Sequence, residues 1–184
     1  RGFLNVDRML LKCGALQVGT TVAVCLAFPA TSTEAATLHV ANAGDSRVLL
    51  VSDGDAPPRR LSVDHVATDP EEVRRVHEAG GRVIGNRVGG SLAVTRALGD
   101  HALKGSGGGV TAEPYCVTHA LGALERFVVL ASDGVWDVLD DYEVQRLVMQ
   151  HEAEAPPELA SRVVQTAMAK GTRDNVSCLV LRLR

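Results

Sequence analysis

Aromatic residues are scarce in this chain of 184 residues, at 3% of the sequence. The hydrophobic core must therefore be built from aliphatic side chains, and rings are too few for a platform that stacks nucleic-acid bases. The net charge is -3, and the basic residues are scattered rather than gathered in a stripe. We therefore expect no nucleic-acid partner.

Long apolar runs and paired cysteines are also absent. No run reaches the roughly 18 residues of a membrane span, and no signal-peptide pattern is present. The four cysteines, Cys13, Cys25, Cys116 and Cys178, form no CxxC pair, so they are expected to be reduced thiols packed in the core. These features predict an intracellular protein, cytoplasmic or nuclear.

The amino-terminal half is typical of one helix followed by antiparallel strands. A chain of this length buries roughly 70% of its unfolded surface, enough for one domain over residues 1–184. Helical spacing of apolar residues stops before Gly14. Strands are predicted at 20–28, 37–43, 47–51 and 61–63, and the turn Gly44-Asp45-Ser46 is expected to join the second and third as a hairpin.

Capping residues mark three later helices. Asp69-Pro70 is typical of a helix start, and Gly80 of its end. Asp140 with Glu143 forms a capping-box pattern, and a third helix is predicted from Pro156 to about residue 170. A last strand is expected at 176–183. Strands in hairpins followed by separate helices predict an α+β fold with helices on the outer faces of antiparallel sheets.

Two acidic turns lie beside predicted strands. Asp133-Gly134-Val135-Trp136-Asp137 follows the apolar run 127–131, and Arg173-Asp174-Asn175 precedes the last strand. Carboxylates brought together at strand ends repel each other unless a cation or a proton neutralises them. Oxygen ligands favour Mg²⁺ or Mn²⁺. The turns therefore indicate a site for a hard metal ion.

Several short blocks, taken in order, resemble the metal-dependent protein serine/threonine phosphatases of type 2C. They are Val18-Gly19-Thr20-Thr21-Val22-Ala23-Val24, Ala41-Asn42-Ala43-Gly44-Asp45-Ser46-Arg47, Gly90-Ser91-Leu92-Ala93-Val94-Thr95-Arg96-Ala97-Leu98-Gly99-Asp100, Leu130-Ala131-Ser132-Asp133-Gly134-Val135-Trp136-Asp137 and Asp174-Asn175. The resemblance implies two packed antiparallel β-sheets flanked by antiparallel helix pairs, an αββα sandwich. It also implies hydrolysis of phosphoserine and phosphothreonine in a protein substrate by metal-activated water.

The resemblance also implies roles for individual residues. Asp133 and Asp174 are similar to the ligands of the catalytic metal pair, two Mg²⁺ or Mn²⁺ ions. Asp45 and Asp137, with Asp133, are similar to the carboxylates that hold a weaker third ion. The segment at about 64–90 resembles the flap beside the active site of the family.

Other residues of these blocks are interpreted mainly as structural. Arg96 is expected to form an ion pair with Asp100 or Asp45, with contact to phosphate as the alternative. Asp100 is interpreted as a cap or turn residue. Gly134 and Asn175 are placed near the site, for substrate or for structure, and Trp136 is assigned to core packing. Gly19-Thr20-Thr21 is interpreted as a tight entry to a buried strand.

The sequence departs from the family pattern in lacking the Asp-Gly-His-Gly block, whose aspartate bridges the two catalytic metals. We therefore expect no catalytic residues in this chain beyond the metal ligands, weak metal binding and negligible turnover for the chain alone. We also expect missing amino-terminal strands, open sheet edges and uncovered apolar side chains. The block could lie in an upstream segment, could be lost in a degenerate relative, or could be supplied by another chain.

The leading hypothesis is the carboxy-terminal majority of a metal-dependent protein serine/threonine phosphatase. The alternative is a pseudophosphatase that binds a regulatory protein partner without catalysis. A third hypothesis is a bacterial-style regulatory phosphatase that acts on a single partner. The retained carboxylates Asp45, Asp133, Asp137 and Asp174 favour the first hypothesis, and the absent block favours the second.

Overall fold

The computed structural model describes residues 1–33, 35–54, 56–105 and 107–183. Its residue contacts define two compact units. The first consists of Arg1–Ala23, Ala41–Asp45 and Val63–Tyr115, and the second of Val24–Val40, Ser46–Ser62 and Cys116–Arg184. Within the described residues, no helix is both long enough and apolar enough to cross a lipid bilayer.

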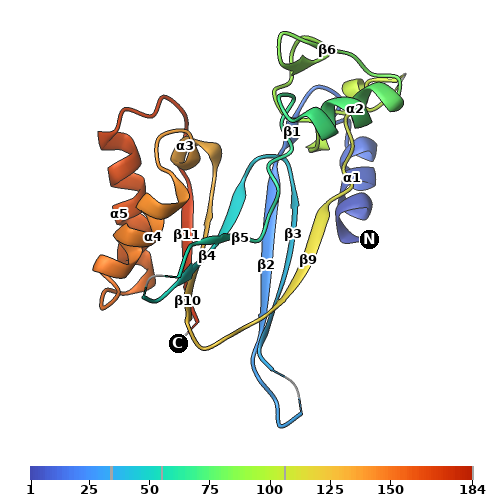
Figure 1. Ribbon diagram of the computed structural model, residues 1–184. Coiled ribbons are helices and arrows are strands. Elements are labelled where there is room, and N and C mark those ends of the chain that lie inside the picture. The colour runs from blue at the N-terminus through green and yellow to red at the C-terminus, as the bar shows by residue number, and fades with distance from the viewer. Residues whose placement is uncertain (34, 55, 106, 184) are drawn as a thin grey trace. The chain divides into compact units, whose positions relative to one another are not determined.

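A four-stranded antiparallel sheet forms the centre of the second unit (Figure 1). Its strands, in spatial order, are β11 (Cys178–Arg182), β10 (Glu125–Ala131), β4 (Arg47–Ser52) and β5 (Arg59–Arg60). Val129 of β10 pairs with Leu49 on one side and with Val180 on the other. Every residue of β4 is buried. Since side chains alternate between the faces of a strand, β4 is covered on both faces, as in the inner layers of a two-sheet sandwich.

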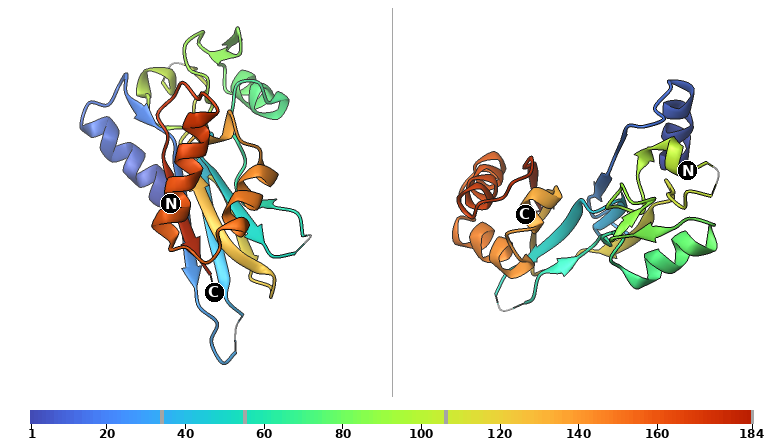
Figure 2. Two further views of the ribbon diagram at one scale, coloured as in Figure 1. Left: turned by 90° about the vertical axis from the view of Figure 1, so that its left-hand side faces the viewer. Right: turned by 90° about the horizontal axis from the view of Figure 1, so that it is seen from above.

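Three helices of the second unit accompany this sheet: α3 (Asp133–Trp136), α4 (Asp141–Gln150) and α5 (Pro156–Ala169). Figures 1 and 2 show α4 and α5 side by side against it, and α5 contacts β11 while α4 contacts β4. The predicted capping box is present, because Asp140 accepts from the backbone N–H of Glu143 and the Glu143 side chain accepts from that of Asp140. The hydrophobic core between helices and sheet, aliphatic except for one ring, includes Leu49, Phe127, Val129, Val144, Leu159 and Val163.

A second, three-stranded sheet has the order β2 (Val22–Phe28), β3 (Thr37–Ala43) and β9 (Tyr115–Ala120). β2 lies at its edge and contains no buried residue. The expectation that Gly19-Thr20-Thr21 leads into a buried strand is therefore wrong about burial. The expected open edge and uncovered apolar side chains are present, because Leu26 and Phe28 are 54% and 51% exposed.

The first unit contains α1 (Gly2–Lys12), β1 (Gly19–Thr20), α2 (Pro70–Glu78), β6 (Val83–Ile84), β7 (Arg87–Val88), β8 (Leu98–Gly99) and the 3-10 helix η1 (His101–Leu103). β1 pairs with β8, and β6 pairs with β7. Gly85 and Asn86, both with positive φ, form the two-residue turn between β6 and β7. A small cluster that includes Ala67, Val76, Val88 and Val94 forms the core around α2.

The α+β fold with antiparallel sheets is confirmed, and the predicted helices are found with small shifts at their ends. The predicted hairpin at Gly44-Asp45-Ser46 is wrong, because β3 and β4 belong to different sheets. The predicted strand at 61–63 is also wrong, since the short strand is Arg59–Arg60. The cysteines are free, as expected, but Cys13 and Cys116 are exposed rather than packed in the core.

Candidate functional site

The first acidic turn lies where β10 ends and α3 begins. Ser132 is the N-cap residue of α3, and Asp133 is its first residue. The backbone N–H of Gly134 donates to Oδ1 of Asp133 at 2.9 Å. Asp137 ends the same short helix, and its N–H donates to the carbonyl oxygen of Asp133 at 2.8 Å. Asp133 and Asp137 are thus one helical turn apart, and both lie just after the end of β10, as the sequence indicated.

The second acidic turn is joined to the first by hydrogen bonds. Asp174 accepts the N–H of Asn175 on its Oδ1 at 2.6 Å. The hydroxyl of Ser132 donates to the carbonyl oxygen of Asn175 at 3.3 Å and accepts from the N–H of Ser177 at 3.0 Å. The N–H of Ser132 also donates to the carbonyl oxygen of Ser177 at 3.0 Å. Because Ser132 forms three of these bonds, the two turns are held against each other.

Gly134 is needed for this close approach. A Cβ atom at its position would lie 2.4 Å from the carbonyl oxygen of Asn175, well inside van der Waals contact. Gly134 is buried. Its role in the structure is therefore to let the Asp174-Asn175 turn pack onto α3.

The carboxylates in these turns repel one another. Burial raises the pKa of Asp133, and the negative charges of Asp174 and Asp137 raise it further, against the opposing hydrogen bond from Gly134. Asp137 and Asp174 also line a cavity of about 320 Å³, together with Val138, Gly171, Thr172 and Arg173. The arrangement favours a bound cation, which would relieve the repulsion.

Oxygen donors of this kind fit Mg²⁺ or Mn²⁺ by their chemistry. Within the part of the chain that the structure describes, however, no group of three or more His, Cys, Asp or Glu side chains is already arranged around a common metal position. Asp133, Asp137 and Asp174 thus form one electrostatic cluster, but their carboxylate oxygens do not surround a common point.

Asp45 lies in the first unit, two residues after the end of β3. The preceding residue, Gly44, has φ +104, and a Cβ atom there would lie 2.3 Å from the Thr21 side chain. Nδ1 of the buried His65 is 3.1 Å from the carbonyl oxygen and 3.3 Å from the amide nitrogen of Gly44. Asn42 donates to the same carbonyl oxygen at 3.2 Å. Buried polar groups therefore fix the backbone that carries Asp45.

Arg96 forms a structural ion pair, but its partner is Glu72 of α2 rather than the aspartates named from the sequence. The Arg96 guanidinium donates to both carboxylate oxygens of Glu72, the shortest contact being 2.6 Å. It also donates to the carbonyl oxygen of Glu113 at 3.0 Å. This pairing uses the guanidinium within the first unit, and it leaves the Arg96 side chain 18% exposed.

The ion pair of Glu72 was not predicted from the sequence, because the helix dipole alone explains an acidic residue in the first turn of a helix. It also accepts from the Thr95 hydroxyl at 2.5 Å and from Arg75 at 3.1 Å. Burial would raise the pKa of Glu72, but the hydrogen bonds from Arg96, Thr95 and Arg75 hold it at about 2. Its position four residues before the buried Val76 was the available signal, because both lie on the inward face of α2.

Asp100 is a turn residue, in agreement with its interpretation from the sequence. It adopts the left-handed conformation, with φ 48 and ψ 39, just before η1. Its N–H donates to the carbonyl oxygen of Val18 at 2.9 Å. Gly19 and Gly99 are paired across β1 and β8, and a Cβ atom on Gly19 would collide with the Asp100 carboxylate. The close approach expected at Gly19 is therefore confirmed.

Residues 1–176 match the family model for protein phosphatase 2C. The chain belongs to this family. Protein phosphatase 2C homolog 1 of Schizosaccharomyces pombe is 42% identical over 147 residues, which is 79% of this chain and 40% of that protein. Protein phosphatase 2C homolog 1 of Saccharomyces cerevisiae is 40% identical over 146 residues, covering 79% of this chain and 50% of that protein.

Solved structures agree with the assignment. A C. elegans sex determining protein is 30% identical with a TM-score of 0.80, over 98% of this chain and 45% of that one. A serine-threonine phosphatase 2C from Toxoplasma gondii, 22% identical, has a TM-score of 0.79 over 99% of this chain and 65% of that one, and supports the fold alone. The chain spans half the length, or less, of the two curated relatives named above.

Proposed function

We propose that this sequence is part of a metal-dependent protein serine/threonine phosphatase, and that Asp133, Asp137 and Asp174 hold a divalent cation. The observation that supports this most directly is that the Ser132 hydroxyl joins the two acidic turns. Burial and the charges of Asp174 and Asp137 then raise the pKa of Asp133. A cluster of like charges at a strand end is expected where a cation supplies the opposite charge. Membership in the protein phosphatase 2C family supports the same assignment.

The proposed substrate is a phosphoserine or phosphothreonine side chain of a protein. When bound, Mg²⁺ or Mn²⁺ would acidify water and neutralise charge on the transferring phosphoryl group. Asp133 and Asp174 would be the principal ligands of a catalytic pair, and Asp137 would contribute to a weaker third site. Gly134, Asn175 and Ser132 would fix the positions of these carboxylates through the hydrogen bonds of the two turns.

Arg96 and Asp100 have structural roles in this proposal, because Arg96 is engaged by Glu72 and Asp100 forms the turn into η1. The segment from 64 to 90, which contains α2 and the β6–β7 hairpin, is proposed as a flap within a type 2C phosphatase-like domain over residues 1–184. The four free thiols agree with an intracellular location.

The decisive experiment is Mn²⁺-dependent release of phosphate from a phosphothreonine peptide. It compares the 184-residue chain with a version extended at its amino terminus by a segment that carries the Asp-Gly-His-Gly block, each with an Asp133→Asn variant. We expect activity only in the extended, unmutated protein. Asp53→Asn is the matched control, since Asp53 is 48% exposed and forms a surface ion pair with Arg126. Equal activity of the Asp133→Asn variant at added Mn²⁺ would refute the role of Asp133.

A further inference from the structure

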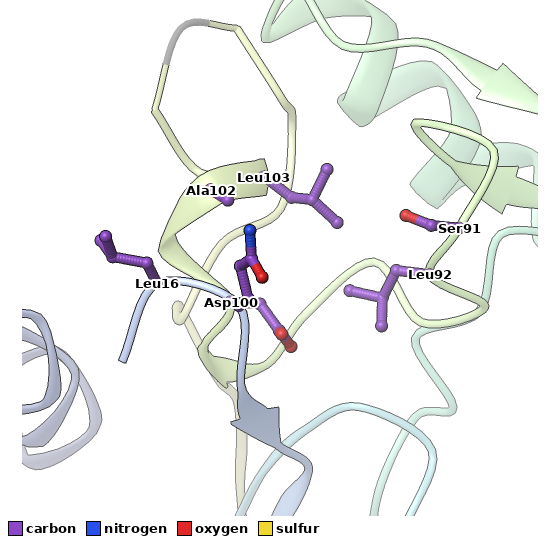
Figure 3. Close-up of a pocket in the computed structure, with 7 residues that line it drawn as sticks. Leu16, Ser91, Leu92, Asp100, Ala102 and Leu103 are labelled. Atoms are coloured by element: carbon purple, nitrogen blue, oxygen red, sulfur yellow. The ribbon is translucent and has the colours of Figure 1, made fainter. Parts of the chain in front are cut away.

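A pocket in the first unit is built from residues that the proposed reaction does not use. It has a volume of about 330 Å³, and Leu16, Gln17, Leu92, Asp100, Ala102 and Leu103 are among its lining residues. Figure 3 shows Leu92 and Leu103 projecting into the same space from two different segments, with Asp100 beside them. The volume is at the low end of the range for small-ligand sites, so it suits one side chain rather than a large molecule.

The pocket has rigid walls. The N–H of Asp100 donates to the carbonyl oxygen of Val18 at 2.9 Å, and the N–H of Ala102 donates to that of Leu16 at 2.8 Å. These bonds join the segment before β1 to η1. Leu92 and Leu103 also pack against the small core around α2. The pocket is therefore formed before any ligand arrives.

Among the residues that the structure describes, Asp100 is the only charged one that lines the pocket. Its carboxylate caps no backbone N–H of η1, and it has no ion-pair partner among the residues that the structure describes. The neighbouring basic side chains are engaged elsewhere, because Nζ of Lys104 is 2.5 Å from Oδ1 of Asp7 and Nε2 of His101 is 3.5 Å from the same atom. The half-buried carboxylate of Asp100 thus lacks a counter-charge on an otherwise uncharged surface.

The backbone conformation that positions this carboxylate is energetically unfavourable. A non-glycine residue in the left-handed conformation is disfavoured, by about 1 kcal/mol or more. The carboxylate also occupies the space beside Gly19, where a Cβ atom would lie 2.1 Å from Oδ2. Gly19 on the facing strand and the left-handed turn at Asp100 together place one negative charge at the opening of this largely apolar pocket.

We propose that this pocket binds a lysine or arginine side chain of a peptide partner. The cationic head pairs with Asp100, and the aliphatic stem lies against Leu92 and Leu103. Lys and Arg combine these two properties, a long apolar stem and a charged end. The assignment rests on charge complementarity and does not require the phosphatase reaction.

The test is direct binding of short peptides to the 184-residue chain, followed by NMR chemical-shift titration. The probes are acetyl-Gly-Lys-Gly-amide, the same peptide with norleucine in place of lysine, and butylamine as a free amine. We expect the lysyl peptide to bind about 2- to 5-fold more tightly than the norleucine peptide, since the two differ in the charged group. The shifts are expected at Leu92, Asp100 and Leu103.

The matching protein variant is Asp100→Asn, which removes the charge with little change in volume, and asparagine tolerates the left-handed conformation. We expect it to weaken lysyl-peptide binding by about 2- to 5-fold. Glu78→Gln is the control, because it removes the same charge from a side chain that is 71% exposed in the same unit. Circular dichroism of both variants checks that the fold is kept.

Three results would overturn the proposal. They are equal affinity for the lysyl and norleucine peptides, unchanged lysyl-peptide affinity in Asp100→Asn, and binding of butylamine without binding of the peptide. Because no result depends on phosphate release, a failure here is distinguishable from a failure of the proposed phosphatase function.

Discussion

At the scale of single residues, Gly134 determines how closely the two acidic turns approach. Its Cα faces the carbonyl oxygen of Asn175, and the Ser132 hydroxyl bridges the same carbonyl and the N–H of Ser177. An added methyl group at position 134 would press on the backbone of the Asp174-Asn175 turn without contacting any carboxylate. The glycine thus links a packing requirement to the position of proposed metal ligands.

We predict that Gly134→Ala destabilises the chain by about 1–3 kcal/mol, because the new methyl group would lie 2.4 Å from a backbone oxygen and the turn must move. Urea denaturation measures the change. Gly2→Ala is the control, since nothing lies within 4 Å of a Cβ atom there. An unchanged midpoint for Gly134→Ala would show that the turns separate without cost.

Asp133 provides a second residue-scale prediction. Without divalent cations, Asp133→Asn should leave the thermal midpoint unchanged or raise it, because the substitution removes repulsion from Asp174 and Asp137. Added Mn²⁺ should raise the midpoint of the unmutated chain more than that of the variant, since a ligand that binds the folded state stabilises it. Differential scanning fluorimetry with and without Mn²⁺ measures both effects, with Asp53→Asn as the control. Equal Mn²⁺ shifts in the two proteins would contradict a role for Asp133 in metal binding.

At the scale of elements, local signals in the sequence predicted the helices well and the strand partners poorly. Asp69 and Asp140 accept the backbone N–H groups that their capping patterns required. The hairpin predicted at Gly44 failed, because a turn sequence fixes a change of chain direction and not which sheet the next strand joins. Sheet membership depends on contacts between distant residues, such as Val129 with Leu49 and Val180.

Helix α2 depends on Glu72, which joins it to Arg96, Thr95 and Arg75. Since the pKa of Glu72 in the folded chain, about 2, is below its ordinary value of 4.5, its contribution to stability is complete above pH 4.5. That contribution, roughly 3 kcal/mol, is lost as the pH falls from 4.5 towards 2. We predict that Glu72→Gln reduces stability at pH 6 and flattens the loss between pH 5 and pH 3.

Urea denaturation at a series of pH values measures the Glu72 effect. Glu78→Gln provides the control, because the ion pair of Glu78 with Arg74 spans 3.9 Å between side chains that are 71% and 69% exposed. Parallel acid profiles for the Glu72→Gln variant and the unmutated chain would mean that other carboxylates dominate the acid response.

At the scale of the whole molecule, the sequence predicted that Asp133 lies with Asp137 and Asp174, while the place of Asp45 beside them stays a prediction. It did not predict which partners the neighbouring residues take. The acidic turns were expected together because both flank buried strands, and Ser132 confirms the link by its bonds to Asn175 and Ser177. Arg96 was expected to pair with Asp100 or Asp45, but it forms its ion pair with Glu72, which is distant in the sequence. A long side chain can reach several acids, so its partner is decided only when the elements pack.

The exposed edge strand β2 is expected to promote association between copies of the chain. Val24, Leu26 and Phe28 are spaced by two residues, so they share one face of the strand, and they are 36%, 54% and 51% exposed. An exposed apolar edge strand is a template for pairing with another chain, and a charge on it opposes that pairing. We therefore predict concentration-dependent association of this chain in light scattering, and its suppression by Leu26→Lys. Met168→Lys is the control, because Met168 is 63% exposed and lies on helix α5 rather than on a strand. Equal suppression by both variants would assign the association to general surface hydrophobicity or net charge rather than to the edge of β2.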